Sequence, residues 1–148
     1  LDRVTGLYTR AHFDDLCRRE IKLAQRQQRA LAVVMTALSG EVLDGPNADQ
    51  VIRLVGEAIR ASLRKVDVAG RYDHQTFAMV LLDTDAVGAE SLMGRIEARV
   101  EASRAAGKIR GVFAVRHAVG TVAQDGYEGL LKATRDRLAR GGATRRRT

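Results

Sequence analysis

The chain has 148 residues, of which 45% are hydrophobic and 29% charged, as is typical of one globular domain. No apolar run reaches the roughly 18–20 residues that span a bilayer, and the single cysteine, Cys17, excludes an internal disulfide bond. The formal net charge is +7, but four of the 25 basic residues fall within residues 140–148, where no acidic residue occurs. This clustering at one end, together with an aromatic content of 4%, argues against a nucleic-acid-binding surface on the domain.

Apolar residues recur at helical spacing in some segments and form strand-length runs in others. The pattern predicts helices over residues 9–28, 49–63, 85–107 and around 130–138, and strands over residues 31–38, 67–72, 77–82, 109–115 and 118–122. The first strand is almost continuously apolar, which predicts that both of its faces are covered. The alternation of helices and strands predicts an α/β fold, with a central mixed sheet flanked by helices. We assign residues 1–142 to this domain and residues 143–148 to a basic C-terminal tail.

Two motifs resemble those of the GGDEF domain, the diguanylate cyclase domain of bacterial signalling. Residues 2–10 (Asp-Arg-Val-Thr-Gly-Leu-Tyr-Thr-Arg) resemble the family's opening Asp-x-Leu-Thr-Gly-Leu-x-Asn-Arg. Between the second and third strands, Arg71, Tyr72 and Phe77 match the frame of the family's Arg-Tyr-Gly-Gly-Asp/Glu-Glu-Phe. The resemblance extends over essentially the whole chain and implies a nucleotidyl cyclase-like fold. A chain that begins on the opening motif also suggests a piece of a larger protein.

Inside this frame the residues that the family uses for chemistry are replaced. The five-residue signature reads Asp73-His74-Gln75-Thr76-Phe77, so Gln75 and Thr76 stand where the resemblance places the catalytic carboxylates. Ala37 stands where it places a metal-binding aspartate. Joining two GTP molecules requires divalent cations, and such hard cations bind carboxylate oxygens. We therefore expect no cyclase activity, no bound metal and no requirement for magnesium.

Other positions of the implied substrate site differ as well. Asp73 and His74 replace the two signature glycines, which adds bulk and a negative charge where the backbone of the family approaches phosphate. The loop after the first strand is about five residues shorter than is usual in the family, and Glu41 and Val42 occupy its Phe-Lys positions. Gly142 stands in place of a phosphate-contacting lysine, and Asp49 alone matches a guanine-contacting aspartate. His74 is interpreted as an exposed residue of the turn, because no second histidine lies at metal-binding spacing.

A second family motif is retained. Many cyclases of the family carry an inhibitory product site, an Arg-x-x-Asp motif six residues before the signature, and Arg64-Lys65-Val66-Asp67 has this sequence at this spacing. The family's supporting arginine, 18 residues after the signature Phe, falls at Arg95. Arginine can bond guanine O6 and N7 or pair with phosphate, and a carboxylate can accept from the guanine amino edge. Arg64, Asp67 and Arg95 are therefore the predicted ligand-binding residues for cyclic di-GMP.

These observations favour an inactive domain that binds cyclic di-GMP as a receptor and acts through a homodimer or a neighbouring signalling domain. A dimerisation or protein-interaction module that binds no nucleotide remains an alternative. So does a domain that senses GTP, although Asp73 and the short loop argue against it. Residual cyclase activity is the hypothesis with the least support. No membrane contact is expected, and the expected location is the cytoplasm, including the case in which the domain is the cytoplasmic part of a larger protein.

Overall fold

The computed structural model describes residues 1–109, 111–122, 126–140 and 143–147. Helices and strands alternate along the chain much as the apolar pattern predicts. In chain order the elements are α1 (Arg10–Gln27), β1 (Leu31–Ser39), the 3-10 helix η1 (Glu41–Asp44), α2 (Ala48–Ser62), β2 (Val68–Arg71), β3 (Thr76–Leu82), α3 (Ala86–Ala105), β4 (Phe113–Thr121), α4 (Tyr127–Ala139) and β5 (Ala143–Arg147).

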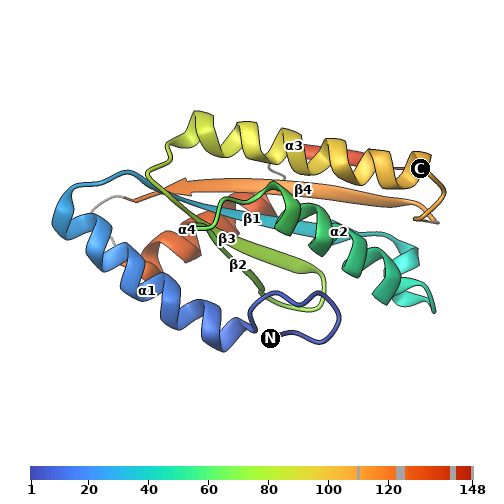
Figure 1. Cartoon of the computed structure of the whole chain (residues 1–148), viewed down its shortest axis with the longest axis horizontal. Coiled ribbons are helices and arrows are strands. Elements are labelled where there is room, and N and C mark those ends of the chain that lie inside the picture. Colours follow the sequence, from blue (N-terminus) through green and yellow to red (C-terminus); the bar gives the residue numbers. More distant parts are fainter. Residues whose placement is uncertain (110, 123–125, 141–142, 148) are drawn as a thin grey trace.

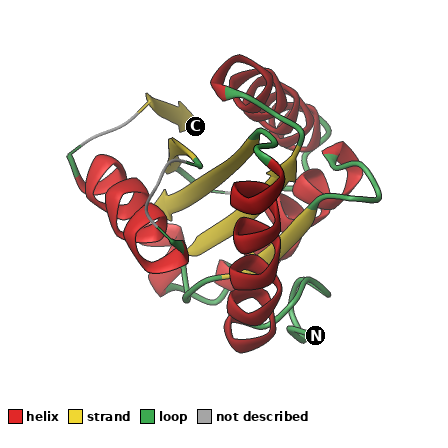
Figure 2. Ribbon diagram, turned by 90° about the vertical axis from the view of Figure 1, so that its left-hand side faces the viewer, coloured by secondary structure: helices red, strands yellow, loops and turns green. Residues whose placement is uncertain are grey.

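The strands form one sheet in the order β2-β3-β1-β4-β5, with helices on both faces (Figures 1 and 2). The paired strands run antiparallel. Within the described residues, parallel pairing is confined to an isolated bridge between Tyr8 and Gly70. The predicted α/β fold with helices flanking a central sheet is confirmed. The prediction that this sheet is mixed is wrong, because all of its described strand pairs are antiparallel.

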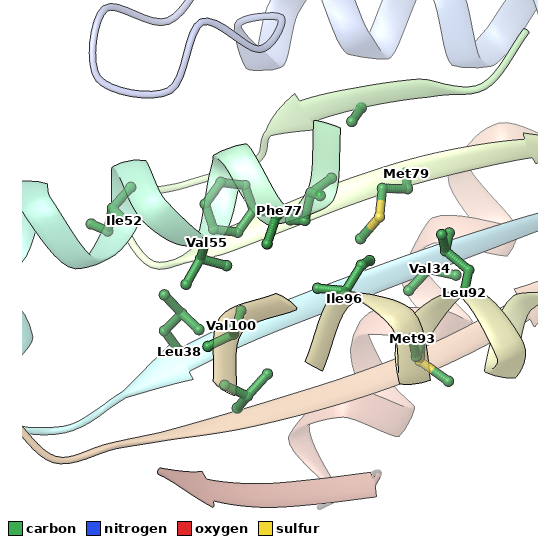
Figure 3. Close-up of a cluster of buried hydrophobic side chains, with 14 of the residues drawn as sticks. Val34, Leu38, Ile52, Val55, Phe77, Met79, Leu92, Met93, Ile96 and Val100 are labelled. Atoms are coloured by element: carbon green, nitrogen blue, oxygen red, sulfur yellow. The ribbon is translucent and has the colours of Figure 1, made fainter. Parts of the chain in front are cut away.

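The central strand β1 is buried on both faces, as its apolar run predicts. Val34 and Leu38 belong to the core beneath α2 and α3, whereas Val33 and Met35 belong to the core beneath α1 and α4. Figure 3 shows the first of these cores, where Ile96 of α3 packs among the side chains from the sheet. Because successive side chains of a strand point to opposite faces, one strand serves both layers.

The prediction of two strands over residues 109–115 and 118–122 is wrong, because β4 is a single strand. Arg116 and His117 suggest a polar break in the sequence, but the side chain of His117 is buried and hydrogen-bonded. Its Nδ1 lies 2.9 Å from Oγ1 of Thr36 on β1, and its Nε2 lies 2.8 Å from Oε1 of Glu97 on α3. Buried polar groups are tolerated where they have such partners, so the strand continues through this point.

The opening motif has a structural role in the fold. Oδ2 of Asp2 accepts hydrogen bonds from the backbone N–H (2.9 Å) and the hydroxyl (2.7 Å) of Thr5, and Nη1 of Arg71 lies 3.2 Å from Oδ1 of Asp2. Burial opposes ionisation of Asp2, but the bonds from Thr5 and the charge of Arg71 outweigh it and lower the pKa of Asp2. The motif thereby joins the start of the chain to the end of β2.

Residues Ala143–Arg147, which sequence analysis assigned to the basic tail, form β5, and their backbone pairs with β4. The boundary between residues 142 and 143 stays a prediction, because residues 141 and 142 lie outside the described part of the chain. The replacement of a lysine by Gly142 lies outside it for the same reason. No helix in the described ranges combines the length and the apolar character needed to cross a membrane.

Candidate functional site

A pocket of about 400 Å³ lies where the end of α2, the loop before β2, the end of β3 and the first turns of α3 meet. It contains all three ligand-binding residues that the sequence predicts. The residues that line it are Ala30, Arg64, Asp67, Leu81, Asp83, Thr84, Asp85, Gly88, Ser91, Leu92 and Arg95. Arg64 and Asp67 come from the turn between α2 and β2, and Arg95 comes from the third turn of α3.

Arg64 and Asp67 form a closed turn stabilised by their own side chains. Oδ2 of Asp67 accepts from the backbone N–H of Arg64 (3.0 Å) and from its Nε (3.1 Å), while Oδ1 accepts from its Nη2 (2.9 Å). The carboxylate is 4% exposed, whereas the arginine side chain is 54% exposed. The buried carboxylate therefore orients the guanidinium, and its oxygen atoms are largely occupied by Arg64.

Two further acceptors fix the same guanidinium against the sheet. Nη2 of Arg64 donates to the backbone carbonyl of Leu82 (2.6 Å) and to Oγ1 of Thr84 (2.9 Å). The hydrogen bond to Asp67 raises the pKa of Arg64 and so favours the charged guanidinium. Nη1 has no hydrogen bond to any residue that the structure describes. Arg64 is thus held on one edge of its planar group while Nη1 remains available to a ligand.

Arg95 is less constrained. Its side chain is exposed, and Nη1 lies 3.3 Å from Oγ of Ser91, one turn earlier on α3. The pocket therefore combines one fixed and one adjustable guanidinium. A planar, fixed group suits recognition of a base edge, and an adjustable one suits a phosphate, whose oxygens accept from many directions.

Two aspartates of the pocket were not predicted as site residues. Asp83 pairs with Arg29, and the hydrogen bond from Arg29 lowers the pKa of Asp83. Oδ1 of Asp85 accepts from the backbone N–H of Gly88 (2.9 Å) and caps α3. The fold brings Asp83 and Asp85 into the pocket that Arg64 lines.

Asp73, His74 and Gln75 of the signature segment lie in the turn between β2 and β3, and Thr76 and Phe77 begin β3. Oδ1 of Asp73 accepts from the backbone N–H of Gln75 (2.9 Å), so this carboxylate closes the turn. His74 is exposed at the turn, in agreement with the interpretation from sequence, and its carbonyl accepts from Nη2 of Arg71 (3.0 Å). Thr76 is the first residue of β3 and lies opposite Ala37 of β1 in the sheet.

The side chains at these positions do not fit a pair of divalent cations. Ala37 offers a methyl group, Gln75 an amide and Thr76 a buried hydroxyl, while the carboxylate of Asp73 is engaged by the backbone of the turn. Hard cations prefer several carboxylate oxygens converging on one point. No step of GTP condensation can be assigned to this donor set. Asp49, which resembles a guanine-contacting residue, is exposed in the first turn of α2.

The sheet order, the flanking helices and the hairpin beside the central strand define a nucleotidyl cyclase-like α/β domain. The chain belongs to the GGDEF family, because the family model described as "Diguanylate cyclase, GGDEF domain" matches residues 1–140. Comparison with curated proteins gave no significant match.

Solved GGDEF structures share the fold at low sequence identity. The GGDEF domain of DgcB from Caulobacter crescentus, solved in complex with c-di-GMP, is 21% identical, with a TM-score of 0.82 over 94% of this chain and 85% of that one. Diguanylate cyclase SiaD from Pseudomonas aeruginosa, solved with its activator SiaC, is 21% identical, with a TM-score of 0.79 over 94% of this chain and 56% of that one. The active GGEEF domain of a Vibrio cholerae diguanylate cyclase is 15% identical, with a TM-score of 0.77 over 91% and 90%.

Proposed function

We propose that this GGDEF domain is catalytically inactive and acts in bacterial signal transduction as a receptor for cyclic di-GMP. The observation that carries the proposal is the contrast between two sites. Arg64, Asp67 and Arg95 line one pocket, whereas Ala37 and Gln75 occupy positions where catalysis would need carboxylates. The complex of the similar DgcB domain with c-di-GMP supports the same ligand class.

Within the pocket we assign a separate role to each residue. Arg64 reads the O6 and N7 edge of a guanine with Nη1, and Arg95 pairs with a phosphate. Asp67 positions Arg64, because its carboxylate is buried and already accepts three hydrogen bonds from that residue. Asp85 keeps an oxygen beyond the one that caps α3 and can accept from the guanine amino group.

The size and charge of the pocket suit part of a cyclic dinucleotide. A volume of about 400 Å³ lies within the range of about 300–1,000 Å³ that small-molecule sites occupy. Its three aspartates offset its two arginines, so the pocket is not a general anion site. A ligand that presents guanine N–H donors and phosphate oxygens can bond the aspartates with the former and the arginines with the latter.

The signal would leave the domain through protein contacts. A homodimer or a fused or partner signalling domain would respond to the bound nucleotide, and the SiaD complex shows that a similar cyclase is bound by an activator protein. We place this function in the cytoplasm and assign no cofactor to it. Binding would not require magnesium, since the pocket recognises the ligand through arginine.

The proposal is tested by calorimetric titration of the purified chain with cyclic di-GMP, with GTP as the comparison. Arg64→Ala is the test variant, and Arg104→Ala is the matched control, because Arg104 lies on α3 and pairs with Glu101 outside the pocket. We expect binding that Arg64→Ala weakens at least tenfold, no such change in Arg104→Ala, and no turnover of GTP with magnesium. Binding that is the same in both variants would refute the proposed site.

A module that binds no nucleotide is the second candidate, and one observation favours it. The guanidinium of Arg64 already has acceptors in Asp67, Leu82 and Thr84, so the motif also serves to join α2 to β3. In that case the folded wild-type chain would show neither heat nor a rise in melting temperature with any guanine nucleotide. GTP sensing would instead give binding of GTP that depends on the β2–β3 turn.

A further inference from the structure

Three hydrogen-bond donors meet on the face of the sheet that carries α1 and α4, opposite the core beneath α2 and α3. Tyr72 follows β2 directly and is 5% exposed within the α1–α4 core. Its hydroxyl oxygen accepts from Nη2 of Arg10 on α1 (2.9 Å) and from Nη1 of Arg135 on α4 (3.2 Å). Two helices and the end of a strand thus direct polar groups to one point.

The hydroxyl of Tyr72 is only partly satisfied by these contacts. A phenol oxygen accepts through two lone pairs and donates one hydrogen, and both accepting positions are taken by the arginines. The hydrogen itself has no acceptor among the residues that the structure describes. The hydrogen is therefore free to bond water or an acceptor from outside the chain.

The positive charge at this point is only partly compensated: Asp14 lies near Arg10, and the charge of Arg135 acts on the neighbouring Asp136. Arg10 stacks on the Tyr72 ring, 4.1 Å from its centroid, and lies 3.8 Å from Oδ2 of Asp14. That carboxylate accepts from the hydroxyl of Tyr127 through its other oxygen. Arg135 forms no ion pair with a carboxylate in the described part of the chain. Two positive groups therefore share one neutral oxygen, and like charges so close repel each other.

We propose that Arg10, Arg135 and Tyr72 form a binding site for a phosphate group. An oxyanion between the two guanidiniums would accept from both and from the Tyr72 hydroxyl, and these are the short, charge-assisted bonds that bind phosphate best. A phosphate monoester carries a charge of about −1.5 to −2 at pH 7, which matches two arginines. The site lies on the face of the sheet opposite the core that the Arg64 pocket adjoins and is independent of the proposed function.

The test is titration of the chain with inorganic phosphate and with adenosine monophosphate, followed by NMR or calorimetry at constant ionic strength maintained with chloride. Tyr72→Phe removes only the hydroxyl, and Arg135→Gln removes one charge. Lys132→Gln is the matched control, because Lys132 is exposed on the same helix and pairs with Asp136.

We expect saturable binding that Tyr72→Phe and Arg135→Gln each weaken at least tenfold, with less than a twofold change in Lys132→Gln. The tighter of the two probes identifies free phosphate or the phosphate of a nucleotide as the source. Melting curves of each variant without phosphate verify that it is folded. The proposal is overturned if the wild type shows no saturable binding, or if Lys132→Gln loses as much affinity as Arg135→Gln, which would indicate general electrostatic attraction.

Discussion

Asp67 holds Arg64 in place, and replacing it by alanine measures how strongly. Its carboxylate is 4% exposed and accepts three hydrogen bonds from Arg64, one from the backbone and two from the guanidinium. Hydrogen bonds to charged groups contribute about 1.5–3 kcal/mol each where the groups are buried. Because the arginine is 54% exposed, water replaces much of what the guanidinium loses. We therefore expect Asp67→Ala to lower the free energy of unfolding by about 2 kcal/mol.

Urea denaturation measures this loss directly, and thermal denaturation should show a fall in melting temperature of about 4–8 °C for a chain of this size. Asp67→Asn keeps an acceptor oxygen and should cost about half as much. Because Arg64→Ala removes the same side-chain bonds, the double variant with Asp67→Ala should show a coupling of at least about 1 kcal/mol. An Asp67→Ala protein within about 0.5 kcal/mol of the wild type, with additive effects of the two changes, would show that Asp67 does not hold Arg64 in place.

Three further predictions concern the fold. Thr36→Val removes the hydroxyl that bonds Nδ1 of His117 in the core and should cost about 1–3 kcal/mol in urea denaturation; no loss would show that this bond is not formed. Gly70→Ala would place a Cβ 2.6 Å from Cβ of Phe13, so we expect the free energy of unfolding to fall by about 1–3 kcal/mol. A variant as stable as the wild type would contradict this close approach. Asp2 has a pKa below its ordinary value of 3.8, so the stability that its ionised form contributes is complete above that pH and lost as pH falls below it. Asp2→Asn should therefore flatten the acid side of a plot of unfolding free energy against pH. An unchanged plot would contradict the bonds of Asp2 to Thr5 and Arg71.

Much of the fold follows from patterns that the sequence displays. The apolar run around Val34 predicts a strand covered on both faces, and helical spacing predicts a helix over residues 85–107. Both features occur in the structure, the helix as α3. The break predicted near His117 does not occur, because the partners that make a buried histidine acceptable come from β1 and α3. Local pattern contains no information about such distant partners.

The sequence likewise predicts some features of the candidate site and not others. The resemblance to the family's Arg-x-x-Asp motif predicts Arg64, Asp67 and Arg95 as ligand-binding residues, and the fold brings the three to one pocket. The motif does not reveal that the Asp67 side chain is buried against Arg64, or that Asp83 and Asp85 share the pocket, because burial and shared lining are set only when the chain is folded. The convergence of arginines on Tyr72 is likewise invisible in sequence, since its members are 62 and 63 residues apart.

The most direct test of the receptor proposal is the dissociation constant of cyclic di-GMP for the wild type and for Arg95→Ala. Arg95 is exposed and bonds only Ser91 among the described residues, so its loss should change ligand binding while the melting temperature stays nearly constant. We predict binding by the wild type and a dissociation constant at least tenfold higher for Arg95→Ala. Equal affinities in two equally stable proteins, or no binding by the folded wild type, would contradict the account.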